Sequence, residues 1–449
     1  MVAVIAGVVT SPALTTTTVS AAGELGAGGE YHPLTPQRIF DSRPTSSIND
    51  VAPFGPKSQG PTDPTFDLQL LGLGGVPVSS ADVLAVAVSI TVDGPTSAGY
   101  LSAYPAGSPG TSSLLNFAAG QTIPNLAIVR GGTAGKLTVA INGSRVGTAN
   151  VLVDVLGWFS TSTYNAGTPG DLADERGARL IVVPPARLVD TRSDGGVTNP
   201  LGPNSQRTVR FRGASAAGTT IPNDPSVVGA LVNLTAVEPT ANTFMAVVPD
   251  LPVGVPPTSN LNVSAGRVQA NLVMVPVGAD GAIHIYNSAG NTNFIVDVMA
   301  YLQTGADVET RSGRVIPLTS PYRSLDTRQA AWGGVPLGPG QAEDWSFAAF
   351  AGSVNIGGVS VGSQVALLGN LTNAGTTRQF PGVSVEPGFL TVYPADGAPT
   401  PNISNLNSYE SVPVPNMALI KYGPNQTVRV FNARGYSNYI LDVSAVVLL

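Results

Sequence analysis

Three aspartates recur in this chain, each between two arginines. They are Asp41, Asp190 and Asp326, and each follows one arginine by three residues and precedes another by two. Paired carboxylates can cleave glycosidic bonds when one is a general acid and the other a base or nucleophile. The flanking arginines favour a different role, because guanidinium groups on both sides hold a carboxylate ionised in an ion-pair network. We therefore expect these motifs to specify the fold and not to catalyse a reaction.

The motif around each aspartate has the form P-x-R-x-apolar-D-[ST]-R. A Pro-apolar-Gly-Pro turn comes ten to twelve residues after each aspartate, at Pro53–Pro56, Pro200–Pro203 and Pro336–Pro339. Matching motifs followed by matching turns indicate an internal repeat of three units. The charged residues of the motif are Arg38, Asp41 and Arg43 in the first unit, Arg187, Asp190 and Arg192 in the second, and Arg323, Asp326 and Arg328 in the third.

A second aspartate lies near the end of each unit, in a run of apolar residues. These residues are Asp154, Asp297 and Asp442. A lone carboxylate among apolar neighbours is expected to be at least partly buried, and burial of an unpaired charge costs several kcal/mol. We predict that the first arginine of each motif, Arg38, Arg187 or Arg323, pairs with this aspartate within its own unit.

Asparagines also recur at a fixed interval. Each unit contains Ser-x-Leu-Asn, and a further Asn follows nine residues after the first; the residues are Asn116 and Asn125, Asn262 and Asn271, and Asn407 and Asn416. An Asn side chain offers a donor and an acceptor to sugar hydroxyls, but such residues more often hold turns by bonding to backbone groups. We favour the turn. Aromatic residues such as Tyr100, Tyr104, Phe389 and Tyr393 could stack on sugars, yet we expect them in the core.

The repeat divides the 449 residues into three modules of about 125 residues. Strand-like segments at intervals of 8–12 residues, with 52 glycines and 38 prolines, predict an all-β fold of antiparallel sandwiches or barrel-like modules, and we prefer the sandwich. The predicted parts are an N-terminal arm at 1–30, module 1 at 31–160, a linker at 161–179, module 2 at 180–302, a linker at 303–314 and module 3 at 315–449. Whether the modules pack together is left open by the sequence.

The motifs resemble the Asp-Thr-Arg repeat modules of exported actinobacterial proteins and of some actinophage virion proteins. The resemblance covers nearly the whole chain after residue 30. It implies a non-enzymatic module found outside the cell or in a virus particle, and it does not specify a ligand.

Composition excludes several classes of site. The chain has no Cys, which excludes disulfides and thiolate metal sites, and its two histidines, His32 and His284, are in different modules. A net charge of −6 with scattered basic residues argues against a nucleic-acid partner. No phosphate-binding glycine loop or EF-hand calcium loop is visible, so we expect no cofactor and no metal. No run of 18 apolar residues follows the N-terminus, so a membrane span is not expected.

The N-terminal arm combines a short apolar run, Val2–Val9, with small residues at Val19-Ser20-Ala21, as in a signal peptide. A basic region before the apolar run is missing, so a docking arm is the alternative. We expect an extracellular or cell-surface structural and adhesive protein that presents three modules to a protein or glycan surface, or to other copies of itself. A virion component is the second hypothesis, and a carbohydrate-binding protein is the third.

Overall fold

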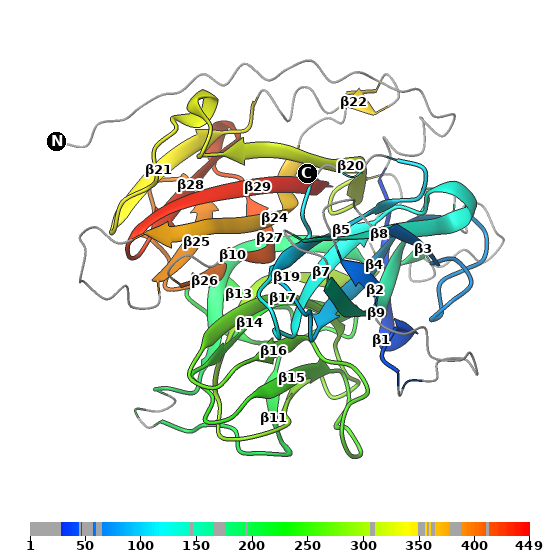
Figure 1. Cartoon of the computed structure of the whole chain (residues 1–449), viewed down its shortest axis with the longest axis horizontal. Coiled ribbons are helices and arrows are strands. Elements are labelled where there is room, and N and C mark those ends of the chain that lie inside the picture. The colour runs from blue at the N-terminus through cyan, green and yellow to red at the C-terminus, as the bar shows by residue number, and fades with distance from the viewer. Residues whose placement is uncertain are drawn as a thin grey trace.

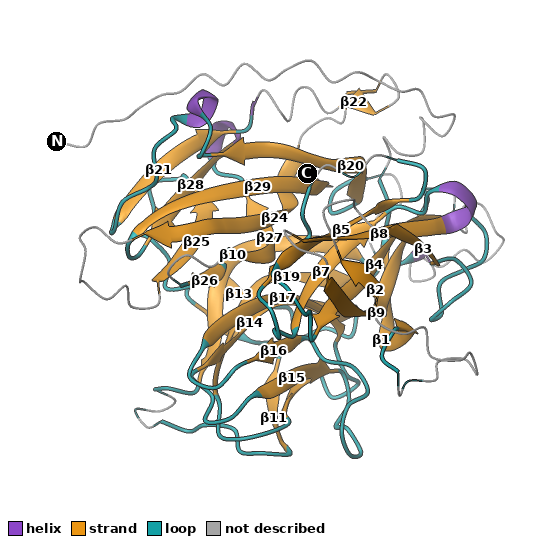
Figure 2. Cartoon of the chain, in the orientation of Figure 1, coloured by secondary structure: helices purple, strands orange, loops and turns teal. Residues whose placement is uncertain are grey.

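The computed structural model describes residues 28–44, 46, 57–59, 65–108, 110, 112–143, 147–162, 164, 176–193, 196, 198–305, 310–348, 355–356, 359–360, 364–377, 388–409 and 413–449. The structure confirms the predicted all-β class: three two-sheet sandwiches follow one another along the chain (Figure 2). Most of the predicted N-terminal arm, residues 1–27, and the Pro53–Pro56 turn lie outside the described residues. No helix in the described part is long and apolar enough to cross a membrane.

Each module has the same eight principal strands, with one short extra strand, which pairs with β9, in module 1 and a short two-stranded hairpin in each of modules 2 and 3. The strands of module 1 are β1 (Tyr31–Asp41), β2 (Lys57–Gln59), β3 (Thr65–Gln69), β4 (Val83–Asp93), β5 (Gly99–Pro105), β6 (Leu115–Phe117), β7 (Ile123–Val129), β8 (Lys136–Gly143) and β9 (Gly147–Ser160). Those of module 2 are β10 (Arg179–Asp190), β11 (Ser205–Arg210), β12 (Ser215–Ala216), β13 (Thr219–Thr220), β14 (Val227–Val237), β15 (Thr243–Val248), β16 (Leu261–Val263), β17 (Val268–Pro276), β18 (Ala282–Asn287) and β19 (Asn293–Gln303).

Module 3 repeats the pattern. Its strands are β20 (Val315–Asp326), β21 (Gln341–Ser346), β22 (Asn355–Ile356), β23 (Val359–Ser360), β24 (Gln364–Thr377), β25 (Gly388–Pro394), β26 (Leu406–Ser408), β27 (Val414–Lys421), β28 (Thr427–Asn432) and β29 (Tyr436–Leu448). Short 3₁₀ helices η1 (Thr133–Gly135), η3 (Ala330–Trp332) and η4 (Pro424–Gln426) lie in connections between strands.

Two antiparallel sheets make up each sandwich. We call one the inner sheet, with strand order β1-β9-β4-β7, β10-β19-β14-β17 or β20-β29-β24-β27, and the other the outer sheet, with order β3-β8-β5-β6, β11-β18-β15-β16 or β21-β28-β25-β26. Apolar side chains between the two sheets form a separate core in each module. The identical strand order in three copies shows that the sequence repeat is a repeat of structure.

The inner sheets are buried on both faces. The central strand β4 has ten consecutive buried residues, from Val83 to Val92. Alternate residues of this strand, such as Val86 and Val88, face the sandwich core, whereas Ala85 and Ala87 belong to a fourth core cluster that draws residues from all three modules. Strands covered on both faces are apolar throughout and do not alternate. The second face of each inner sheet is therefore covered by the neighbouring modules.

The three modules close around a common centre. Strands β7, β17 and β27, the same edge strand in each module, contact one another there, and Figure 1 shows the modules as three lobes around the place where these strands meet. Residues of the shared core include Leu126, Leu272 and Leu419 from these strands. The chain is thus one block with an approximate threefold axis, and not three modules joined as beads by linkers.

Candidate functional site

The repeated charged residues of each module form one ion-pair network. Arg38 binds Asp154 through two hydrogen bonds, at 2.8 Å from Nε and 3.1 Å from Nη2, and its Nη1 lies 3.5 Å from Asp41. Arg43 binds the same Asp41 from the other side, and its Nη2 donates to Asp41 Oδ2 at 2.6 Å. Modules 2 and 3 repeat this arrangement, with Arg187–Asp297 at 2.9 Å, Arg192–Asp190 at 2.6 Å, Arg323–Asp442 at 2.9 Å and Arg328–Asp326 at 2.7 Å. The ion pairs predicted from the sequence are therefore present.

A β-bulge in the first strand explains the spacing of the motif. Residues three apart on a regular strand point to opposite faces. The pairing of β1 with β9 shifts between Arg38 and Phe40, which leaves one extra residue in β1. A bulge of this kind brings Arg38 and Asp41 to the same face, beside Asp154, which lies directly opposite Arg38. The same shift occurs between Arg187 and Val189 and between Arg323 and Leu325.

Burial and the arginines act on these carboxyls in opposite directions. Burial raises the pKa of Asp154, Asp297 and Asp442, and the hydrogen bond from the facing arginine opposes the rise. At Asp41 burial also favours the neutral form, but the hydrogen bonds and charge of Arg43 outweigh it and leave the pKa below its usual value. Each network contains two arginines and two aspartates, so its charges balance and its carboxylate oxygens are occupied.

Two of the three later asparagines, Asn125 and Asn416, each join their own module to another. Asn125 of β7 donates to the Asn370 side chain in module 3, at 2.9 Å, and accepts the backbone N–H of Met417 at 3.0 Å. Asn416 of β27 makes the equivalent bonds to module 2, donating to Asn233 at 3.0 Å and accepting from Leu272 at 3.0 Å. The amide of each residue therefore reaches the next module around the axis.

Our interpretation of these asparagines as turn residues is wrong. Asn125, Asn271 and Asn416 lie inside strands and are buried. Each does bond to a backbone carbonyl eleven residues earlier, those of Leu114, Asn260 and Asn405. For Asn125 and Asn416 the interpretation missed a second set of partners in another module, which no local pattern reveals. The earlier set, Asn116, Asn262 and Asn407, lies on the short edge strands β6, β16 and β26.

The aromatic residues divide between core and surface. Tyr393 is buried as expected, but Tyr100 is 41% exposed on the outer sheet, so the core assignment is wrong for that residue.

The junction between modules 1 and 2 lacks one member of the asparagine ring. Ser89 stands where modules 2 and 3 have Asn233 and Asn370: all three lie opposite the buried aspartate of the last strand. The Ser89 hydroxyl is buried and has no hydrogen-bond partner among the described residues. Asn271, the residue that would meet it, bonds to its own module through the Asn260 carbonyl.

We expect Ser89→Asn to raise the free energy of unfolding by about 1 kcal/mol, because it completes a side-chain hydrogen bond that the other two junctions make. Equilibrium urea unfolding would measure the change, with Ser89→Ala as the control that removes the unpaired hydroxyl and adds no bond. A lower stability of the Asn variant than of the Ala variant would show that this junction has no room for the amide.

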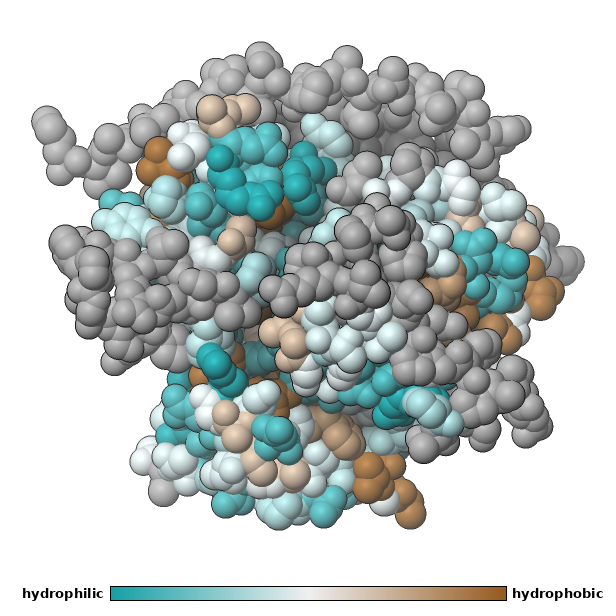
Figure 3. Space-filling view, in the orientation of Figure 1, coloured by the Kyte–Doolittle hydropathy of each residue, from teal (hydrophilic) through white to brown (hydrophobic). Residues whose placement is uncertain are grey.

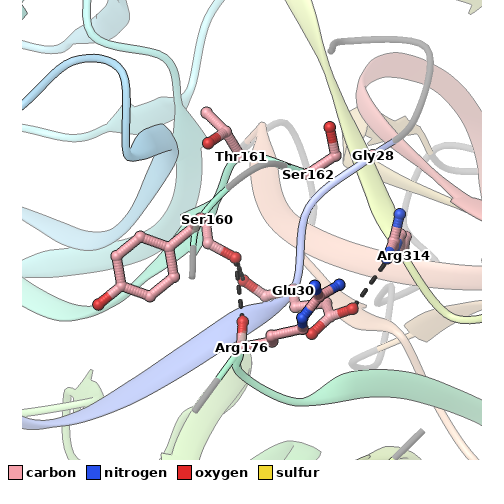
Figure 4. Close-up of a pocket in the computed structure, with 8 residues that line it drawn as sticks. Gly28, Glu30, Ser160, Thr161, Ser162, Arg176 and Arg314 are labelled. Atoms are coloured by element: carbon pink, nitrogen blue, oxygen red, sulfur yellow. Dashed lines mark hydrogen bonds and ion pairs between the residues drawn. The ribbon is translucent and has the colours of Figure 1, made fainter. Parts of the chain in front are cut away.

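A charged cluster closes one end of the axis. Glu30, Arg179 and Arg314 immediately precede or begin the first strand of their modules, and all three are buried. Glu30 Oε1 accepts from Arg179 Nε at 2.7 Å and from Arg314 Nε at 3.3 Å. Figure 4 shows Glu30 and Arg314 on the wall of a small recess, with Arg176 and Ser160 beside them. In the division predicted from the sequence these residues lie in the arm and the two linkers, and no role was expected for them.

Backbone pairing reinforces this closure. Gly29 exchanges two hydrogen bonds with Val315 of module 3, at 2.8 and 2.9 Å, and Tyr31 exchanges two with Ala178, just before module 2, at 2.8 and 2.7 Å. The beginning of module 1 is therefore tied to both other modules.

His32 lies in an aromatic cluster near this recess. Its ring stacks on Trp158 at 4.0 Å and meets the edge of Tyr164 at 5.2 Å. Its Nε2 is buried without a hydrogen-bond partner in the described part of the chain. Burial lowers the pKa of His32 to about 4, against a smaller opposing effect of the Arg176 backbone. The folded protein therefore favours the neutral ring.

This pKa predicts a dependence of stability on pH. The folded value lies below the unfolded value of 6.5, so the unfolded chain binds the proton more tightly, and stability is complete above about pH 6.5 and falls between pH 6.5 and 4. The loss reaches at most about 3 kcal/mol at low pH. Urea unfolding from pH 7 to 4 on wild type and His32→Phe would test it: the stability of wild type relative to the variant should fall over this range, and a difference that stays constant with pH would show that His32 does not titrate as expected.

One hydroxyl, imidazole and carboxylate also meet on module 2. Thr208 Oγ1 lies 3.0 Å from His284 Nδ1, and Asp280 lies 3.3 Å from Nε2 of the same ring. Thr208 and His284 face each other on the outer strands β11 and β18, and His284 is buried. Among the described residues no group of three His, Asp or Glu side chains is placed to hold a metal ion.

Asn287 and Asn432 are further structural residues. The asparagines and the Pro-Leu-Gly-Pro turns are both visible in the sequence, but the hydrogen bonds between them are not. Asn287 Nδ2 donates to the carbonyls of Leu201 and Gly202, and Asn432 Nδ2 to those of Leu337 and Gly338. These asparagines therefore fasten the repeated Pro-Leu-Gly-Pro turns to the outer sheet.

No family model and no curated protein matches this chain. Among solved structures, it is similar to the tandem CBM22-1–CBM22-2 domain of Paenibacillus barcinonensis Xyn10C, with 10% identity over 61% of this chain and 99% of that one and a TM-score of 0.16. It is also similar to a triple jelly-roll protein of an archaeal virus, at 9% identity over 94% and 90% of the chains and a TM-score of 0.15, and to a chain of Sulfolobus turreted icosahedral virus, at 9% identity over 94% and 91% with a TM-score of 0.16. These TM-scores are too low to assign the chain to the family of any of them.

Proposed function

We propose that this chain is a non-enzymatic, exported structural or adhesive protein that presents three repeated β modules to a partner at the cell surface or outside the cell. The resemblance of its motifs to Asp-Thr-Arg repeat modules supports the setting. The signal-peptide-like arm supports export.

The observation that carries the proposal is the closure of the three modules into one block. The shared core and the asparagine bonds hold equivalent surfaces at fixed positions around an axis. Fixed spacing lets weak sites on one molecule bind together without the loss of affinity that flexible linkers impose. A block of this kind is suited to contact a repeating surface.

The state of the acidic groups supports a non-enzymatic role. A general acid or nucleophile needs a carboxyl that can exchange a proton or reach a substrate. In each module the two repeated aspartates instead bind arginines, and their side chains are at most 15% exposed. These aspartates therefore neutralise the arginines of their own module.

A virion structural protein is the second candidate. The approximate threefold axis favours it, because a block with three equivalent lobes fits at a threefold position of a symmetric shell or tail.

Fractionation of the native source tests the proposal. The protein would be located in medium, envelope or virus particles, and its intact mass and N-terminal sequence determined. A chain that begins near Ala22 in medium or envelope is the expected result. A chain that retains Met1 in particles would replace export by the virion role, and an uncleaved chain in the cytosol would refute both.

A further inference from the structure

The second arginine of each motif has an unused edge. Arg43, Arg192 and Arg328 bind their aspartates through Nε and Nη2 only. No hydrogen bond from their Nη1 atoms is found within the described residues, and their side chains are 40%, 47% and 48% exposed. By contrast, Arg38 uses Nε, Nη1 and Nη2 on two aspartates. Each module therefore shows solvent one guanidinium edge, formed by Nη1 and Nη2.

The bound aspartate fixes the direction of that edge. A guanidinium is planar, and a two-point grip on a buried carboxylate leaves little rotation about its long side chain. Asp41 and Asp326 have side chains only 1% and 0% exposed, so each anchor is rigid. The free edge offers parallel N–H donors in the geometry that a carboxylate accepts. Most surface ion pairs are weakened because the side chain loses entropy when the pair forms. Here the arginine side chain is already ordered in the folded protein, so a ligand does not have to order it.

The three edges lie at equivalent places in the modules, beyond the far ends of the first strands. The first strands start together at the cluster of Glu30, Arg179 and Arg314, and each strand leads away from it to the aspartate of its motif. Each strand has 11 or 12 residues and two register shifts, so it is shorter than a regular strand of that many residues. The three arginines are thus related by the approximate threefold repeat of the modules.

We propose that Arg43, Arg192 and Arg328 form a three-point binding surface for an acidic polysaccharide, whose carboxylates repeat along the chain. This inference rests on the proposed function and names the class of partner.

The form of the surface favours a polymer over a folded protein. A stable protein interface needs a continuous patch with apolar or aromatic anchors. None of the exposed large apolar residues belongs to the motifs that carry the arginines, and on the face shown in Figure 3 apolar side chains are scattered in small groups among pale and hydrophilic ones. A flexible acidic chain satisfies separate points, and three weak contacts on one molecule add up by avidity.

Neighbouring acidic residues make the three arginines differ in their expected affinity for a carboxylate. Asp93 lies near enough to Arg43, and Glu238 near enough to Arg192, to raise the pKa of these arginines, and each repels an incoming carboxylate. The charges that act on Arg328 are those of its own network, Asp326, Arg323 and Asp442. Arg328 should therefore contribute most to binding.

Binding of the full-length protein to polygalacturonate would be measured by calorimetry at low salt, with neutral dextran as the reference polymer. Arginine-to-lysine variants keep a positive charge beside the buried aspartate but lose the planar edge. We expect Arg328→Lys to weaken binding about threefold, more than Arg43→Lys or Arg192→Lys, and the triple variant to weaken it by about 30-fold or more. Dextran should not bind.

Arg429 supplies a matched control. It also grips an aspartate, Asp344, through Nε and Nη2, at 2.6 and 2.7 Å, and its side chain is 34% exposed, but it occurs on one outer sheet only. Arg429→Lys should leave polygalacturonate binding unchanged. An equal loss in this variant would show general attraction to basic groups and overturn the proposal.

Two further results would also overturn it: wild type that does not bind polygalacturonate, or a folded triple variant that binds as wild type does. Should the triple variant fail to fold, NMR of wild type decides, since galacturonate oligomers should shift the Nε–H signals of the three arginines and leave that of Arg429 in place. A protein recovered from medium or envelope that ignores the polymer refutes this inference alone, whereas recovery from the cytosol refutes the proposed function.

Discussion

Replacing Asp297 by alanine should lower the free energy of unfolding by about 3–5 kcal/mol, the range found when one partner of a buried ion pair is removed. Asp297 has a side chain only 1% exposed and binds Arg187 through both oxygens, at 2.9 and 3.3 Å. Its removal leaves Arg187, itself only 17% exposed, with the carboxylate of Asp190 alone, which Arg192 already occupies. Equilibrium urea unfolding would measure the loss.

Asp344→Ala is the matched control for this prediction. Asp344 makes the same two-point contact with Arg429, but the two side chains are 40% and 34% exposed. An exposed pair contributes about 0–1 kcal/mol, so this variant should unfold near the wild-type midpoint. Equal losses in the two variants would mean that burial of the Asp297 pair has no energetic consequence.

The second large effect is expected at the axis. Glu30→Ala removes the carboxylate shared by two buried guanidinium groups, those of Arg179 and Arg314. Arg179 keeps bonds to the Thr310 and Ser312 carbonyls, at 3.1 and 2.8 Å, but these neutral acceptors do not cancel its charge. We expect stability to fall by about 3 kcal/mol, as for other uncompensated buried charges.

A triple variant separates charge from packing at this site. Glu30→Leu combined with Arg179→Met and Arg314→Met replaces the cluster by apolar side chains, and replacement of buried ion pairs by apolar residues is often neutral or stabilising. Recovery of most of the lost stability would assign the cost in Glu30→Ala to unpaired charge. A triple variant no more stable than Glu30→Ala would instead show that the arginine contacts with backbone carbonyls hold the modules together.

The repeat, the sandwich class and the ion pairs could be predicted because each leaves a local trace. The apolar run around Asp297 requires a nearby cation, and the motif supplies Arg187 at a constant place in the module. The bulge that lets Arg187 reach both Asp190 and Asp297 is implied by their spacing only once the strand pairing is known.

The closure of the modules could not be predicted because its signals are split between distant segments. Asn125 and Asn370 are 245 residues apart, and nothing near either one points to the other. The unbroken apolar run Val83–Val88 does carry a signal, since a strand exposed on one face would alternate. The sequence around Glu30 gives no signal of this contact. Its partners, Arg179 and Arg314, belong to two later modules, and Glu30 precedes a repeat that otherwise resembles the others.

The cluster at the axis shows what fusion of three modules into one polypeptide permits. In an assembly of three identical chains, whatever residue occupies such a position meets two copies of itself, so a buried ionised group would face like charges. Here the three equivalent positions hold one acid and two bases, a combination that symmetry forbids to a homotrimer. Concatenation has freed each position to diverge, and it also fixes the stoichiometry and order of the modules at synthesis, so the block assembles at any dilution.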